Sequence, residues 1–83
     1  MTYRVLTARR VREQLEGAPP ELRGYVDGVV AFLRVDPVAA SVAFVLLGGP
    51  DFKTIIFAQG RGFLRYHVFE EQRVVVLVHL TWL

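Results

Sequence analysis

Residues 63–80 read Phe-Leu-Arg-Tyr-His-Val-Phe-Glu-Glu-Gln-Arg-Val-Val-Val-Leu-Val-His-Leu, and this stretch decides the fold. Its first seven residues alternate, so that Leu64, Tyr66 and Val68 share one face of a strand and form its better core face. Residues 73–80 are apolar on both faces, which predicts a central strand. Because the polar connection 70–72 is short, the two strands should pair antiparallel.

Upstream of this hairpin the chain contains further strand and turn signals. Residues 52–58 are rich in aromatic and β-branched side chains, and the glycines of residues 59–62 indicate a turn after them. Gly48-Gly49-Pro50-Asp51 predicts another turn, and we favour a strand over Val42–Leu47, within an almost entirely apolar segment. These segments together predict an antiparallel meander of three or four strands.

The N-terminal part predicts a strand followed by a helix. Tyr3-Arg4-Val5-Leu6 is typical of a short strand, and Thr7 is placed to cap a helix that begins near Ala8. Apolar residues at 8, 11 and 15 fall on one helical face. Gly17 then suits a left-handed C-terminal stop.

A second helix should begin at Pro19-Pro20 and end at Asp36-Pro37, because proline favours the first helical turn and disfavours helix in the residue before it. Its apolar stripe comprises Leu22, Tyr25, Val26, Val29, Val30 and Leu33. Gly24 and Gly28 weaken this helix, and close helix–helix approach explains them best. The predicted fold class is α+β: an N-terminal strand and antiparallel helical hairpin packed on a mainly antiparallel sheet, in one domain over residues 1–83.

Composition excludes several classes of function. The 83 residues are 53% hydrophobic and 22% charged, so some apolar surface should remain exposed for a protein partner or a homodimer. The net charge of +2 is small for a non-specific nucleic-acid binder, and the absence of cysteine excludes disulfides and thiolate sites. The N-terminus lacks a signal-peptide pattern and the longest apolar stretch is too short to span a bilayer, so we expect a cytoplasmic protein without a membrane role.

The order of elements and several motifs resemble the RelE/ParE superfamily of bacterial toxins. The segment 3–10, Tyr-Arg-Val-Leu-Thr-Ala-Arg-Arg, is similar to the family's opening strand and basic helix, and 32–37, Phe-Leu-Arg-Val-Asp-Pro, is similar to the end of its second helix. Residues 62–68, Gly-Phe-Leu-Arg-Tyr-His-Val, resemble its Gly-x-x-Arg-Tyr strand, and residues 75–79 its last strand.

The resemblance implies a toxin held inactive by a cognate antitoxin. Some family members cleave mRNA in the ribosomal A site, and others poison DNA gyrase. Arg65 corresponds to the family's strand arginine. From the residues themselves, Lys53 and Arg61 could join it in a phosphate cradle, and His79 could serve as acid or base, with His67 the weaker candidate. Two histidines without a suitably spaced carboxylate predict neither a metal site nor a cofactor.

Other features leave alternatives open. Arg9, Arg10 and Arg12 form a basic cluster that could contact RNA, an acidic antitoxin segment or only water. Trp82 could stack on a base or close a core. The chain has no arginine or tyrosine after His79, where mRNA-cleaving members place such residues, so the alternative is a non-catalytic binding protein: a gyrase inhibitor or an orphan interaction domain.

Overall fold

A computed structural model describes residues 2–37 and 52–83. The predicted strand 42–47 and turn 48–51 lie outside the described residues. The elements follow the order β1 (Arg4–Thr7), α1 (Arg9–Glu16), α2 (Pro20–Val35), β2 (Phe52–Phe57), a short 3-10 turn η1 (Ala58–Gly60), β3 (Gly62–Phe69) and β4 (Val74–Trp82). Strand β4 extends two residues beyond the predicted strand.

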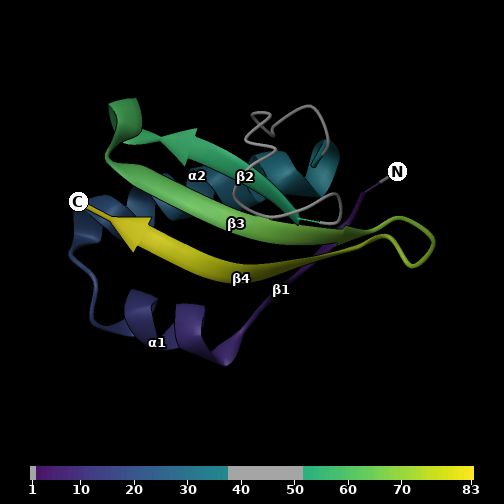
Figure 1. Ribbon diagram of the computed structural model, residues 1–83, viewed down its shortest axis with the longest axis horizontal. Coiled ribbons are helices and arrows are strands. Elements are labelled where there is room, and N and C mark those ends of the chain that lie inside the picture. Colours follow the sequence, from purple (N-terminus) through teal and green to yellow (C-terminus); the bar gives the residue numbers. More distant parts are fainter. Residues whose placement is uncertain (1, 38–51) are drawn as a thin grey trace.

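The four described strands form one sheet in the order β1-β4-β3-β2 (Figure 1). Strand β4 lies inside the sheet, which confirms the prediction of a central strand. The pairs β2–β3 and β3–β4 are antiparallel, as their short connections require, whereas β1 pairs parallel with β4 because both helices intervene. The sheet is therefore mixed but mostly antiparallel.

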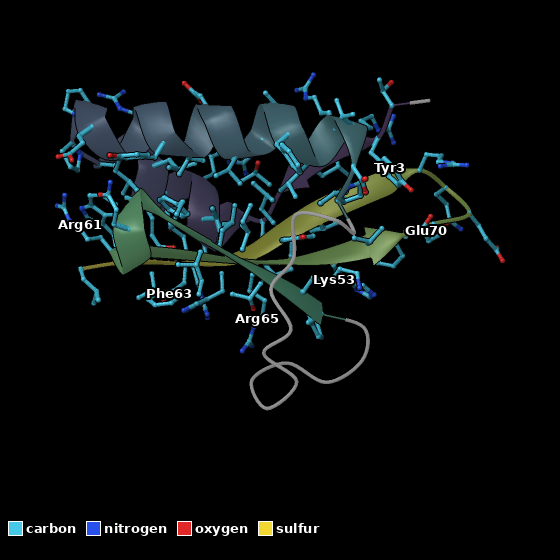
Figure 2. The ribbon with its side chains drawn as sticks, turned by 90° about the horizontal axis from the view of Figure 1, so that it is seen from above. Tyr3, Lys53, Arg61, Phe63, Arg65 and Glu70 are labelled. Atoms are coloured by element: carbon cyan, nitrogen blue, oxygen red, sulfur yellow. The ribbon has the colours of Figure 1, made fainter. Side chains whose placement is uncertain are left out.

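Both helices pack on the sheet, with α2 contacting β1 and β4, and α1 contacting β4. Figure 2 shows α2 above the sheet and the side chains of Phe63 and Arg65 pointing away from it on the opposite side. We call the side that carries Arg65 the open face. The core lies between sheet and helices, and its fully buried members include Val11, Leu33, Leu64, Tyr66, Val75 and Leu77.

Burial of these side chains dominates the stability of the fold. Each fully buried aliphatic side chain contributes about 1.5–3 kcal/mol. The ion pairs Arg9–Glu13 and Arg61–Glu21 are exposed, and such pairs contribute only about 0–1 kcal/mol each. The predicted core face of β3 is confirmed, because Leu64 and Tyr66 have no exposed surface.

Helix α1 begins and ends differently from the prediction. Thr7 does not cap it, because Thr7 pairs with Leu77 as the last residue of β1. The capping position belongs to Ala8, which has no side-chain cap and whose backbone N–H donates to the Leu77 carbonyl at 2.9 Å. Gly17 ends the helix at φ −95°, so the predicted left-handed stop is also wrong. Pairing with β4 keeps the chain extended up to the helix.

Helix α2 confirms its predicted ends, since it begins at Pro20 and ends at Val35, before Asp36. Tyr25 was predicted to lie in the core, but 38% of its surface is exposed. Close packing of α1 against α2 does not explain the glycines: a Cβ at Gly24 or Gly28 would meet no atom within 4 Å among the described residues. Within the described chain, α1 and α2 contact the sheet more than each other.

Gly62 is required at the β2–β3 turn by close packing. It pairs with Phe57 on one side and Trp82 on the other, and those two rings stack at a centroid distance of 6.1 Å and an interplanar angle of 15°. A Cβ at Gly62 would lie 2.3 Å from the Phe57 ring. Gly60, in the turn before it, has φ +90°, which L side chains rarely adopt.

Candidate functional site

Arg65 and His79 are brought together by the register of the sheet. They are direct partners across β3 and β4, and directly opposed residues share one face with Cβ atoms about 4.5–5.5 Å apart. The next pair is Tyr66 with Leu77, so Val78 is the extra residue of a β-bulge. Bulges of this kind re-aim side chains and are frequent beside functional sites.

Arg10 joins this pair from helix α1. An open cavity of about 390 Å³ is lined by Arg10, Phe52, Arg65, Val78 and His79. Two guanidinium groups and one imidazole therefore share one open cavity with the apolar side chains of Phe52 and Val78. Guanidinium groups bind phosphate oxygens through paired N–H donors, so the chemistry of this cavity suits a phosphate.

Lys53 does not face this cavity. It pairs with Tyr66, whose side chain is fully buried beneath the helices, whereas its neighbour Thr54 pairs with Arg65. Successive residues of a strand point to opposite faces. The expectation that Lys53 joins Arg65 in a phosphate cradle is therefore wrong in placement, because the register of β2 puts Lys53 on the other face of the sheet.

Arg61 lies at the far end of the sheet and does not join a cradle with Arg65. Its Nη1 donates to Glu21 Oε1 at 3.1 Å, and its guanidinium lies 4.5 Å from the centroid of the Trp82 ring. Trp82 also contacts Tyr25 at a ring distance of 6.1 Å. Trp82 therefore packs against the core at this end of the domain, and its stacking on a base stays a prediction.

The remaining candidates are dispersed. Arg9 is exposed and forms an ion pair with Glu13 one turn along α1, and Arg12 is exposed on the same helix without lining the cavity. Of the three basic residues of α1, only Arg10 therefore reaches the cavity. His67 lies between two aromatic rings of the open face, at 5.0 Å from Phe52 and 4.2 Å from Phe69.

Sequence reasoning missed an apolar part of the open face. Leu6, Phe52 and Phe69 are 45%, 39% and 40% exposed there. We call these three residues the apolar patch. The signal was available in the alternation of β3, which places Phe63 and Phe69 on the same face as Arg65. The patch lies beside the cationic cavity, since Phe52 contributes to both.

A separate polar cluster ties the N-terminus to the β3–β4 turn. The Tyr3 hydroxyl donates to Glu70 Oε2 at 2.8 Å and accepts from Arg73 Nη1 at 3.2 Å. The hydrogen bond to Glu70 is the main cause that raises the pKa of Tyr3 above 10.0, with burial adding to it. Figure 2 shows Tyr3 and Glu70 at the opposite end of the sheet from Arg61.

Neither a metal site nor a membrane span is evident in the described ranges. Residues 2–37 and 52–83 contain no group of three His, Cys, Asp or Glu side chains placed to hold a metal ion. Within the same ranges, none of the helices has the length and apolar character needed to cross a bilayer.

The fold has close counterparts among solved structures. The toxin–antitoxin complex RelBE of E. coli aligns with a TM-score of 0.79 and 20% identity, covering 98% of this chain and 96% of the matched one. The complex RelBE2 of Mycobacterium tuberculosis aligns with a TM-score of 0.78 and 20% identity, covering 100% of each chain. A mutant of E. coli toxin RelE in the free state aligns with a TM-score of 0.77 and 18% identity, covering 99% of this chain and 84% of the matched one.

This chain has the RelE toxin fold. No family model and no curated protein matches its sequence, so at this level of identity the likeness establishes the fold alone. The resemblance inferred from the order of elements is confirmed at the level of the RelE fold.

Proposed function

We propose that this chain is the toxin of a toxin–antitoxin system and that it cleaves mRNA on the ribosome. The observation that supports this is the pairing of Arg65 with His79 beside Arg10, in one open cavity of a RelE fold. Two cationic side chains and a titratable imidazole are the groups that metal-independent cleavage of a phosphodiester needs. Lys53 and Arg61 lie outside this cluster and have no part in the proposed step.

In the proposed step the ribose 2′-oxygen attacks the adjacent phosphorus. His79 accepts the 2′-OH proton, the bond from phosphorus to the 5′-oxygen breaks, and the products are a 2′,3′-cyclic phosphate and a 5′-hydroxyl whose proton comes from water. Arg65 and Arg10 bind the non-bridging oxygens, where negative charge grows in the transition state. Removing one such preorganised donor typically slows a reaction by about 100- to 1000-fold.

A cognate antitoxin is the proposed inhibitory partner. The apolar patch of Leu6, Phe52 and Phe69 borders the cavity, so a partner that buries the patch would also cover Arg65 and His79. Two of the matched structures are complexes of a toxin with an antitoxin. Action on ribosomes would place the protein in the cytoplasm.

The test is controlled expression of the chain in bacteria, followed by growth measurement and primer extension on cellular mRNA. We expect growth arrest and codon-linked cuts, both lost in Arg65→Gln and His79→Gln. Arg23→Gln, which removes an exposed arginine of α2, is the matched control and should remain toxic. Unchanged cutting by the Arg65→Gln protein would overturn the proposed site.

A second candidate function is non-catalytic binding, either inhibition of DNA gyrase or an orphan interaction. The exposed apolar patch and the net charge of only +2 favour it, because both suit a protein partner better than RNA. Intact mRNA together with broken DNA after induction would indicate gyrase. Intact mRNA and intact DNA, with normal growth, would indicate an orphan interaction domain.

A further inference from the structure

Helix α2 is apolar on two sides, although it buries only one of them. Its buried residues Leu22, Val26, Val29 and Leu33 face the sheet. Away from this buried side, Phe32 is 52% exposed and Val35 69%. A helix that is apolar all round is normally buried all round. Figure 2 shows α2 as the outermost layer, on the opposite side from the open face.

The exposed side of α2 has the spacing of a helix-pairing seam. Gly24, Gly28, Ala31 and Val35 are all exposed and recur at intervals of four, three and four residues, as the a and d positions of two heptads do. Small residues at such positions let two helix backbones approach closely. The open space above both glycines matches this, because a Cβ at either would meet nothing within 4 Å among the described residues.

Two charged residues flank the seam one heptad apart. Asp27 and Arg34 are exposed, and neither side chain forms an ion pair with another described residue. If a second copy of α2 lies antiparallel on the first, each Asp27 faces Arg34 of the other copy. The same register sets the bulky Val35 of one copy opposite Gly24 of the other, and Gly28 opposite Ala31.

We propose that the chain forms a symmetric homodimer through an antiparallel pairing of α2 with α2. A two-fold axis makes every contact twice, so Asp27 and Arg34 of the two copies form two ion pairs. In the same way, Gly24 of each copy leaves room for Val35 of the other. The seam lies on the side of the molecule opposite Arg65 and His79, so dimerisation leaves the cavity accessible. The proposal does not depend on ribonuclease or toxin activity.

The first test is sedimentation equilibrium on the purified full-length chain. We expect a dimer at micromolar concentration and a monomer for Phe32→Glu, which places a charge beside Ala31 of the seam. Phe52→Glu is the matched control, since it charges an exposed aromatic residue of the open face, and it should remain dimeric. A wild-type chain that stays monomeric into the millimolar range, or a dimer that survives Phe32→Glu, would overturn the proposal.

The second test exchanges the charges and is specific for the antiparallel arrangement. Asp27→Arg alone and Arg34→Asp alone should each weaken self-association by at least about tenfold, because like charges then face each other twice. An equimolar mixture of the two variants should form a heterodimer, in which both facing pairs are again opposite in charge. Failure of the mixture to associate, with both variants folded by circular dichroism, would exclude this register.

Discussion

Two arginines four residues apart have different surroundings. Arg61, in the turn before β3, donates to Glu21 and lies over the Trp82 ring, so its charge is used in holding α2, the turn and β4 together. Arg65, within β3, lies opposite His79 and lines an open cavity with Arg10. One guanidinium closes the end of the domain, and the other faces a space that a phosphate can enter.

This difference shows that residue type alone does not assign a role. Both arginines fit a phosphate cradle when only their positions along the chain are known. Their neighbours across the sheet and on α2 separate them. Substitutions at the two arginines and in their surroundings test whether this separation holds.

The largest expected effect is the loss of activity when Arg65 is replaced. If the chain cleaves mRNA as proposed, Arg65→Ala should reduce cleavage by about 100-fold or more, because a preorganised cation at the phosphate is lost. Arg61→Ala should leave most of the activity, since its contacts are internal. Primer extension on mRNA after induction of equal amounts of each protein measures both. Equal losses in the two variants would contradict the distinction between them.

The largest effect on stability should come from the packing beside Arg61. Gly62→Ala places a Cβ against the stacked Phe57 ring and should destabilise the fold by about 1–3 kcal/mol, as overpacking does. Urea unfolding followed by circular dichroism measures the change. Gly17→Ala is the control, because a Cβ there would meet no atom of the described residues within 4 Å and φ is negative. Gly62→Ala unfolding like the wild type would show that the ring moves aside freely.

Arg61 itself should contribute less to the free energy of unfolding than the packing around Gly62. Arg61→Ala removes a cation–π contact and an exposed ion pair, and we expect a loss of about 1 kcal/mol in the free energy of unfolding. Arg61→Lys retains the charge but loses the planar group over Trp82, so it should recover only part of that loss. A Lys variant as stable as the wild type would show that the stacking contributes nothing.

The smallest effect should lie at the opposite end of the sheet, at Tyr3. The pKa of Tyr3 is raised above 10.0 in the folded chain, so its hydroxyl contacts stabilise the fold at neutral pH. This contribution is lost as the pH rises from 10.0 through the raised pKa of the folded chain. The difference in stability between the wild type and Tyr3→Phe should therefore shrink in alkali. Unfolding by urea at neutral pH and above pH 10.0 measures it.

Much of the fold was predictable because its signals are local. Alternation in β3 identified Leu64 and Tyr66 as core, and proline marked both ends of α2. Prediction failed where a distant partner overrides a local preference. Thr7 is a good cap residue, but pairing with Leu77 keeps it in the strand.

The candidate site was only half predictable. Arg65 and His79 were identified from the sequence, and the structure places them together. Arg10 was assigned only to a general basic cluster. Lys53 was assigned to the phosphate cradle, although it lies on the other face of the sheet from Arg65. Helix α1 and β4 are far apart in sequence, so no local pattern could indicate that Arg10 reaches the same cavity.

The sequence by itself determined the order of elements, the core face of the hairpin and the ends of the second helix, because periodicity and proline act over a few residues. Only the tertiary structure decided which cations meet. The register of a strand sets the face on which each side chain lies, and a shift by one residue moves every side chain to the opposite face. That is the physical reason why Arg65 faces His79 while Lys53 faces the other way.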